Sequence, residues 1–162
     1  IDFNVTSSLW LTTRMGREFD GKHMVMINIS SLCAVQPFPT MATYCAGKAA
    51  RDMYNATLAK ENTTLRILNY APGALRTEMT DCLRSSETLD RGLHAWFQSS
   101  YEKDELIPPD KTATKLVRLV LDDTFESGQH IDYWDVYKEM DETEDQGCQQ
   151  DLAAMKVRHA SV

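Results

Sequence analysis

The amino-acid sequence predicts an α/β fold in which a parallel sheet is flanked by helices. Two nearly continuous apolar runs, over residues 24–29 and 65–70, are typical of strands that are covered on both faces. Segments with helical composition precede and follow these runs, so that helix and strand alternate three times along the chain. A chain of 162 residues is long enough for one such domain and too short for two.

Each remaining element has a signal of its own. Apolar residues at helical spacing predict a helix over 4–19. An alanine-rich composition predicts a second helix over 41–60, and a single apolar face predicts a third over 111–121. A last strand is expected over 129–134, after a glycine. The segment 77–109 has scattered apolar residues and is interpreted as an irregular helical excursion over the sheet.

Composition excludes several classes of protein. The formal net charge of −7 and the lack of a basic stripe argue against a nucleic-acid partner. No apolar run approaches the roughly 20 residues that a membrane span needs. The cysteines form no Cys-x-x-Cys pair, so we expect no disulfide and a reducing, cytoplasmic location; they are Cys33, Cys45, Cys82 and Cys148. The histidines show no metal-ligand spacing, so we expect no metal and place them at the surface; they are His23, His94, His130 and His159.

Tyr44 and Lys48 form a Tyr-x-x-x-Lys pair on the alanine-rich helix, where residues four apart project from one face. A free tyrosine, with a pKa of about 10, is a poor acid-base catalyst at neutral pH. A lysine ammonium one turn away favours the phenolate and is expected to lower the pKa of Tyr44. The same spacing occurs by chance on many helices, so the pair needs support from elsewhere in the sequence.

Three further features provide that support. Ser31 ends the first predicted strand within Asn28-Ile-Ser-Ser31, and Pro72-Gly73-x-x-x-Thr77 follows the second strand. The carboxyl ends of parallel strands lie at one edge of a sheet, where α/β folds place their binding sites. Asn4 lies near the start of the preceding helix. We therefore expect these residues to meet at one site.

In this order and spacing, the four elements resemble the signature of the short-chain dehydrogenase/reductase family. The resemblance implies the C-terminal half of a Rossmann-like, doubly wound parallel sheet, with three strands, flanking helices and the N-terminal half missing. Because the chain begins with isoleucine rather than methionine, we interpret it as starting in mid-course. Residues 1–138 would be the C-terminal part of the family's domain, and 139–162, which are acidic and glutamine-rich, a disordered tail.

Longer segments resemble one branch of the family, whose members use NADPH to reduce a pterin side-chain carbonyl in tetrahydrobiopterin synthesis. The segments are Ile29-Ser-Ser-Leu-Cys-Ala34, Gln36-Pro-Phe38, Tyr44-Cys-Ala-Gly-Lys-Ala-Ala-Arg-Asp-Met53, Leu68-Asn-Tyr-Ala-Pro-Gly73 and Ser127-Gly-Gln-His-Ile-Asp132. This branch implies a small-molecule pterin substrate and a homodimer formed through the helices around Asn4 and Tyr44. The resemblance runs from about residue 1 to Trp134 and is loosest over 82–109.

The resemblance also implies a role for each catalytic residue. Tyr44 would donate a proton to the substrate carbonyl oxygen as hydride arrives at its carbon. Lys48 would bind the nicotinamide ribose hydroxyls and lower the pKa of Tyr44. Ser31 would donate a hydrogen bond to the same carbonyl oxygen and stabilise the developing oxyanion. Asn4 would hold a water molecule in the proton relay behind Lys48.

Binding residues are implied in the same way. NADPH would be held by Lys48 and by Leu75, Arg76, Thr77, Glu78, Met79 and Thr80. The substrate would contact Ser31, Leu32, Tyr44, Gly73 and Asp132. The Asp132 carboxylate would accept paired N–H donors from the guanidine-like edge of the pterin.

Several of these residues have a second interpretation. Ser30 competes with Ser31 for the catalytic position, although the Asn-x-x-Ser spacing favours Ser31. Asn4 and Thr77 could instead be helix caps, and Asp132 could be a solvated acid at a strand end. Three aromatic residues are expected to serve in packing, although a pterin pocket could recruit one of them: Trp96, Phe97 and Trp134.

The sequence also departs from the family. It contains neither Gly-x-x-x-Gly-x-Gly nor Gly-x-Gly-x-x-Gly, so the choice of NADPH over NADH rests on the resemblance alone. Two rival functions therefore stay open. One is a short-chain reductase of another small carbonyl compound, and the other is a truncated, inactive dimerisation partner.

Overall fold

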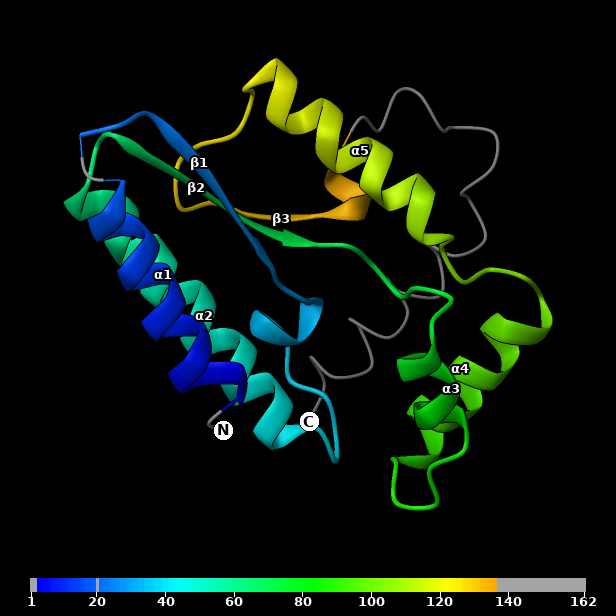
Figure 1. Ribbon diagram of the computed structural model, residues 1–162. Coiled ribbons are helices and arrows are strands. Elements are labelled where there is room, and N and C mark those ends of the chain that lie inside the picture. The colour runs from blue at the N-terminus through cyan, green and yellow to red at the C-terminus, as the bar shows by residue number, and fades with distance from the viewer. Residues whose placement is uncertain (1–2, 20, 137–162) are drawn as a thin grey trace.

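The computed structural model describes residues 3–19 and 21–136, and the predicted tail over 139–162 lies outside them. Three strands and eight helical segments follow one another along the described chain (Figure 1). Their bounds are η1 (Phe3–Ser7), α1 (Ser8–Glu18), β1 (Met24–Ile29), η2 (Leu32–Ala34), α2 (Ala42–Glu61), β2 (Leu65–Ala71), α3 (Glu78–Arg84), α4 (Arg91–Glu102), α5 (Pro109–Asp122), β3 (His130–Asp132) and η3 (Tyr133–Asp135).

The strands form one parallel sheet in the order β1-β2-β3. Asn28 of β1 is opposite Asn69 of β2, which is in turn opposite His130 of β3. These three polar residues therefore form a row across the sheet, close to the carboxyl ends of the strands. The fold class expected from the sequence is confirmed, a three-stranded parallel sheet with flanking helices.

Helices cover both faces of the sheet, as Figure 1 shows. On one face, α2 packs over β1 and β2, and Leu65 and Ile67 form a core with Ala59. On the other face, α5 packs over β2 and β3, where Leu68 and Ile131 belong to a second core. The approach of α2 to the start of β3 is close, because a Cβ on Gly128 would lie 3.1 Å from Cα of Ala56. None of the described helices is long and apolar enough to cross a membrane.

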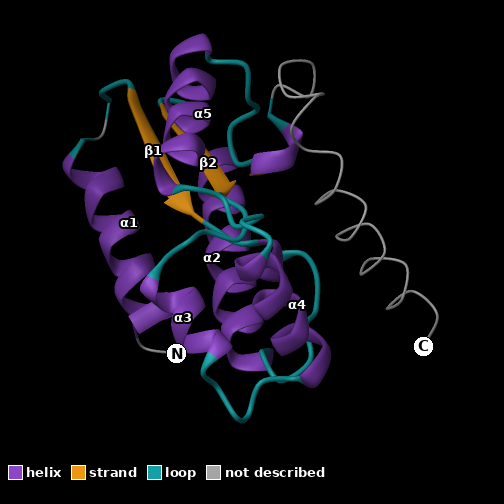
Figure 2. Cartoon of the chain, turned by 90° about the vertical axis from the view of Figure 1, so that its right-hand side faces the viewer, coloured by secondary structure: helices purple, strands orange, loops and turns teal. Residues whose placement is uncertain are grey.

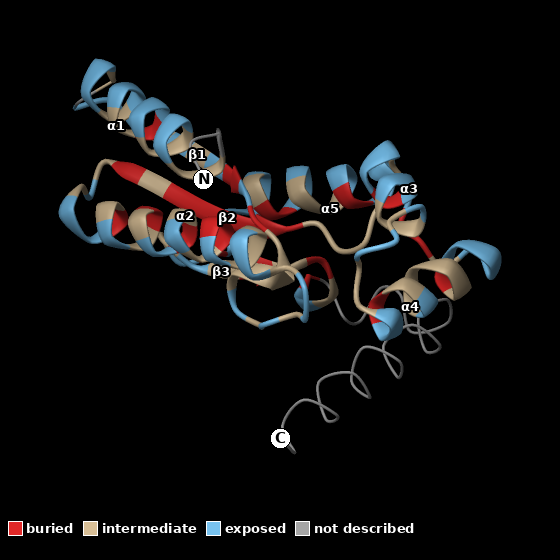
Figure 3. Ribbon diagram, turned by 90° about the horizontal axis from the view of Figure 1, so that it is seen from below, coloured by how far each residue is buried: buried red, intermediate tan, exposed pale blue. Residues whose placement is uncertain are grey.

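One face of β1 differs from the prediction that this strand is covered on both sides. Met24 and Met26 pack against the α2 core, but Val25, Ile27 and Ile29 are 43%, 39% and 46% exposed. The reason is that α5 lies over β2 and β3 rather than over β1 (Figures 1 and 3). Apolar composition alone could not show that only one face of this strand is covered.

The chain also departs from the predicted elements at three places. The last strand ends at Asp132, because a capping box turns the chain into η3: Asp132 accepts from the Trp134 amide and donates its own amide to Asp135. The irregular excursion over 77–109 contains two regular helices, α3 and α4, which lie together beyond the end of β2 (Figure 2). The first helix begins with a π-helical turn, η1, before α1.

Candidate active site

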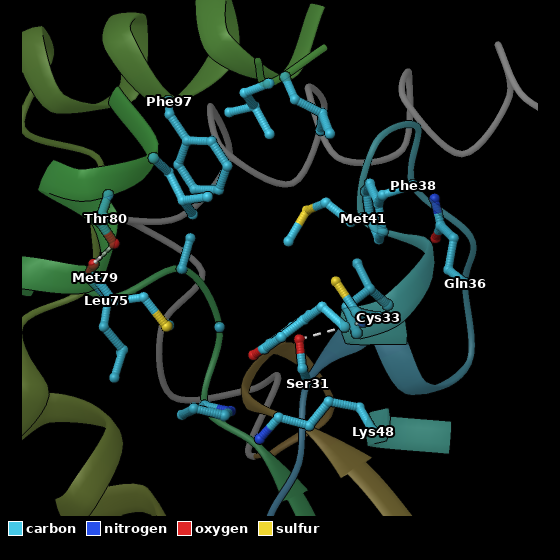
Figure 4. Close-up of a pocket in the computed structure, with 18 of the residues that line it drawn as sticks. Ser31, Cys33, Gln36, Phe38, Met41, Lys48, Leu75, Met79, Thr80 and Phe97 are labelled. Atoms are coloured by element: carbon cyan, nitrogen blue, oxygen red, sulfur yellow. Dashed lines mark hydrogen bonds between the residues drawn. The ribbon is translucent and has the colours of Figure 1, made fainter. Parts of the chain in front are cut away.

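A pocket of about 960 Å³ opens at the carboxyl ends of the strands, between the start of α2 and the α3–α4 pair. Its volume is in the range that holds a small organic ligand. Figure 4 shows Ser31, Cys33 and Lys48 on one wall, and Leu75, Met79, Thr80 and Phe97 on the opposite wall. The lining is mainly apolar, and its polar groups include Ser31 just after β1, Lys48 of α2 and Asp132 of β3.

Most of the residues predicted from the sequence line this pocket. They are Asn4, Ser31, Leu32, Tyr44, Lys48, Gly73, Leu75, Thr77, Met79, Thr80 and Asp132. The structure does not bring the other two predicted cofactor residues, Arg76 and Glu78, to the pocket. Arg76 instead pairs with Asp104 at 2.8 Å, and Glu78 is exposed in the first turn of α3. Residues 75–77 precede α3 and residues 78–80 form its first turn, and along this segment side chains alternately border the pocket and face away from it.

The two serines have different surroundings. Ser30 is buried, and its hydroxyl donates to both carboxylate oxygens of Asp52 at 2.7 Å. Ser31 caps η2, where its Oγ accepts from the Cys33 amide at 3.2 Å, and it lies close enough to Tyr44 to lower the pKa of that phenol. Both serines border the pocket, but the Ser30 hydroxyl is engaged with Asp52, which leaves Ser31 as the hydroxyl beside Tyr44.

Lys48 and Tyr44 lie one turn apart on α2, and both line the pocket. The Lys48 ammonium donates to the Ile29 carbonyl at 2.8 Å and lies 5.7 Å from the centroid of the Tyr44 ring. A lysine ammonium has three N–H donors, so the bond to Ile29 uses only one of them. The group can therefore bind a further acceptor within the pocket.

The net pKa shift of Tyr44 is opposite to the one predicted. Burial raises the pKa of Tyr44, while the hydrogen bond with Ser31 and the charge of Arg51 oppose this rise. Burial also lowers the pKa of Lys48, and the nearby Arg51 charge lowers it further. Loss of solvation is thus the largest cause of the pKa shift in both groups, as expected for partly buried ionisable side chains. The sequence spacing could not show this burial.

The alternative interpretations can now be compared with the geometry. Asn4 is inside η1 rather than at its boundary, and it lines the pocket. Thr77 occupies the N-cap position of α3 but makes no side-chain capping bond. Asp132 ends β3, as both of its interpretations require, and its half-buried side chain caps η3 and borders the pocket. Gly73 has a φ of 81°, and a Cβ there would lie 2.4 Å from Ile107.

Several pocket residues were not predicted from the sequence. Three aromatic residues that were expected to serve in packing line the pocket: Trp96, Phe97 and Trp134. Phe38, Met41 and Cys33 line it as well. Burial raises the pKa of the Cys33 thiol to about 11, so it stays protonated at neutral pH. His130, expected at the surface, contacts the Asp52 carboxylate at 2.6 Å. No short-range spacing signals this contact, since it joins residues 78 positions apart.

Comparison with known families identifies the class of protein. Residues 1–88, more than half of the chain, match the short chain dehydrogenase family. The chain therefore belongs to this family, as the parallel sheet and the grouping of Ser31, Tyr44 and Lys48 already indicate.

Within the family, the sequence is similar to sepiapterin reductase. It is 43% identical over 136 residues to the sepiapterin reductase of Rattus norvegicus, a match that covers 82% of this chain and 52% of the relative. The sepiapterin reductase of Xenopus tropicalis is 41% identical, with the same shares covered. A benzil reductase of Bacillus subtilis is 30% identical over 72% of this chain and 51% of its own length. The chain thus spans about half the length of each of these relatives.

Solved structures show the same fold at lower identity. A mutant 4-hydroxyisoleucine dehydrogenase complexed with NADH and succinate matches with a TM-score of 0.64 and 22% identity, over 81% of this chain and 55% of that chain. A short-chain dehydrogenase/reductase from Saccharomyces cerevisiae matches with a TM-score of 0.63 and 23% identity, over 68% and 46% respectively.

Proposed function

We propose that this chain supplies the catalytic residues of an NADPH-dependent carbonyl reductase that acts on the side chain of a pterin, in the synthesis of tetrahydrobiopterin. The observation that carries the proposal is the convergence of Ser31, Tyr44 and Lys48 on one wall of a largely apolar pocket that Asp132 also borders. The similarity to sepiapterin reductase over 82% of the chain supports the choice of substrate.

In this proposal Tyr44 is the general acid. Its raised pKa keeps the hydroxyl protonated at neutral pH, which is the form that can donate to a carbonyl oxygen. Ser31, which lies beside Tyr44, would donate a second hydrogen bond to the same oxygen and stabilise its developing charge. Asn4 would hold a water molecule that returns a proton through Lys48 to Tyr44.

The residues present fit one end of a nicotinamide cofactor, which supplies a hydride when bound. The remaining N–H donors of Lys48 suit the ribose hydroxyls, and four lining residues follow β2 at the same edge of the sheet. These residues are Leu75, Thr77, Met79 and Thr80. NADPH rather than NADH is supported by the sepiapterin reductase resemblance, because no residue of this chain is assigned to the 2′-phosphate.

The pterin would enter between the two walls of the pocket. Apolar and aromatic side chains on α4 and near η3, including Phe97 and Trp134, suit a flat heterocycle. The Asp132 carboxylate would accept hydrogen bonds from the N–H groups of the pterin edge. A charge-assisted contact of this kind orients the ring so that its side-chain carbonyl faces Tyr44.

The substrate assignment can be tested in a fusion protein in which the N-terminal part of rat sepiapterin reductase precedes residue 1. Asp132→Asn is expected to lower kcat/KM for sepiapterin about ten- to a hundredfold, because one charge-assisted hydrogen bond is lost. A simple dicarbonyl compound without a pterin ring should be reduced at nearly the parental rate. Steady-state kinetics with both substrates measure this difference.

Asp135→Asn is the matched control, because Asp135 shares the capping box with Asp132 but does not line the pocket. It should leave the ratio of the two kcat/KM values unchanged. Equal loss on both substrates in Asp132→Asn would indicate a folding defect and remove the argument for a pterin. The enzyme would then be a short-chain reductase of another carbonyl compound, as the similarity to benzil reductase also allows.

The proposal includes a homodimer formed through α1 and α2. Trp10 and Leu11 of α1 are 67% and 54% exposed, and Met53 of α2 is 69% exposed. Large exposed apolar side chains on two neighbouring helices are typical of protein interfaces, and a second copy would cover them. Dimerisation without catalysis would be the function if the fusion protein assembles but reduces no carbonyl substrate.

The free thiols of Cys33, Cys45 and Cys82 are in keeping with a cytoplasmic location.

A further inference from the structure

A buried polar cluster lies directly behind the pocket, and its centre is the carboxylate of Asp52 on α2. Asp52 is 8% exposed. Its Oδ1 accepts from Nδ2 of Asn28 at 3.0 Å, and its Oδ2 is 2.6 Å from Nδ1 of His130. The Ser30 hydroxyl donates to both oxygens at 2.7 Å. One carboxylate thus joins α2 to residues of β1 and β3.

The middle strand takes part through Asn69, which is opposite both Asn28 and His130 in the sheet. Its Oδ1 accepts from Asn28 at 2.9 Å and from Asn55 of α2 at 3.1 Å. The row of polar residues across the sheet is therefore bonded to α2 at three positions, since Arg51 also donates to Oδ1 of Asn28. Most sheet–helix interfaces in a core are apolar, so a buried network of this size favours one relative placement of its elements.

Two of the residues that contact Asp52, Ser30 and His130, lie within two positions of a predicted site residue along the chain, and Ser30 itself also borders the pocket. Ser30 directly precedes Ser31, and His130 is two positions before Asp132 on the same face of β3. Asp52 itself follows Lys48 by one helical turn, so both lie on one side of α2. A shift of the Asp52 carboxylate would therefore move the Ser31 hydroxyl, the Lys48 ammonium and the Asp132 carboxylate relative to one another.

We propose that Asp52 is a positioning residue, which holds Ser31, Lys48 and Asp132 in the arrangement that carbonyl reduction requires. This inference rests on the proposed function. Asp52 does not line the pocket, so it is not placed to touch a bound substrate or cofactor. It acts through the side chains that it anchors, as outer residues do in other preorganised active sites.

The charge of Asp52 has a second effect, on Lys48. Burial and the Arg51 charge lower the pKa of Lys48, whereas the Asp52 carboxylate and Cys33 of η2 oppose this fall. Tyr44, one turn before Lys48, is the other titratable side chain beside it. Asp52 thus helps to keep Lys48 protonated, which is the state that donates to ribose hydroxyls.

The test uses Asp52→Asn in the fusion protein. The amide keeps the size of the side chain but turns an NH₂ donor toward groups that already donate, so the cluster must rearrange. We expect kcat for sepiapterin to fall about a hundredfold, as misplaced catalytic groups typically cause. The alkaline limb of the kcat/KM profile should move to lower pH, because Lys48 then loses its proton more readily. Glu61→Gln, the same charge change at an exposed site on α2, should change neither quantity.

Two single-contact variants keep the carboxylate and cover the case in which Asp52→Asn does not fold. Ser30→Ala should lower kcat more than it raises KM, since it releases Ser31. His130→Ala should mainly raise KM for sepiapterin, since it releases Asp132, and His130→Asn, whose amide can replace the donor, should restore it. A purely structural role would give the same loss in all of these variants, or none.

A measurement that does not need activity separates this inference from the proposed function. Competitive acetylation of Lys48 across a pH series gives its pKa by mass spectrometry. This pKa should be lower in Asp52→Asn than in the parental protein and unchanged in Glu61→Gln. If the parental protein reduces no sepiapterin, the proposed function fails but this comparison still applies. An unchanged Lys48 pKa, or a folded Asp52→Asn enzyme with parental kcat, would overturn the inference.

Discussion

Replacement of Tyr44 by Phe in the fusion protein is expected to lower kcat for sepiapterin by at least about a hundredfold, the effect of losing a general acid. Phenylalanine keeps the ring beside the Lys48 ammonium and removes only the hydroxyl that would donate the proton. Binding of NADPH should change little, because Lys48 keeps its bond to the Ile29 carbonyl. Stopped-flow turnover and a fluorescence titration with NADPH measure the two quantities separately.

Tyr54→Phe provides the matched control on the same helix. The Tyr54 hydroxyl bonds to Thr13 of α1 and does not line the pocket, so its loss should leave kcat unchanged. Turnover of Tyr44→Phe within about threefold of the parental value would exclude Tyr44 as the acid, since proton transfer by a positioned side chain contributes far more than this.

The second large effect concerns the chain by itself. Residues 1–162 expressed alone are expected to bind no NADPH at micromolar concentration. The sequence has no glycine-rich loop before a helix that could hold the cofactor's pyrophosphate. Within the described residues β1 pairs only with β2, and three of its apolar side chains are exposed. An apolar strand at a sheet edge favours aggregation, so low solubility or loose packing is also expected.

Isothermal titration with NADPH and a thermal melt of the purified chain test this expectation together. The expected result is no binding heat and a broad, weakly cooperative melt. A sharp melt whose midpoint rises with NADPH would contradict it, because ligand binding to a folded state raises stability. Such a result would show that these residues are sufficient for cofactor binding.

The periodicity and composition of the chain were enough to predict the main elements. Apolar runs mark β1 and β2 within one residue of their bounds, and the alanine-rich segment marks α2. These signals are local, because strand and helix require different spacings of apolar residues. The motif around Tyr44 and Lys48 is local as well. Their place on one face of α2 follows from helix geometry alone.

Contacts between distant segments were decided only by the tertiary structure. Asp52 and His130 meet across 78 positions, and Ser30 bonds to the same carboxylate, which leaves Ser31 as the hydroxyl beside Tyr44. The position of α5 leaves one face of β1 exposed, and burial reverses the expected pKa shift of Tyr44. Burial and charge proximity depend on the packing of whole elements, which no short sequence pattern contains.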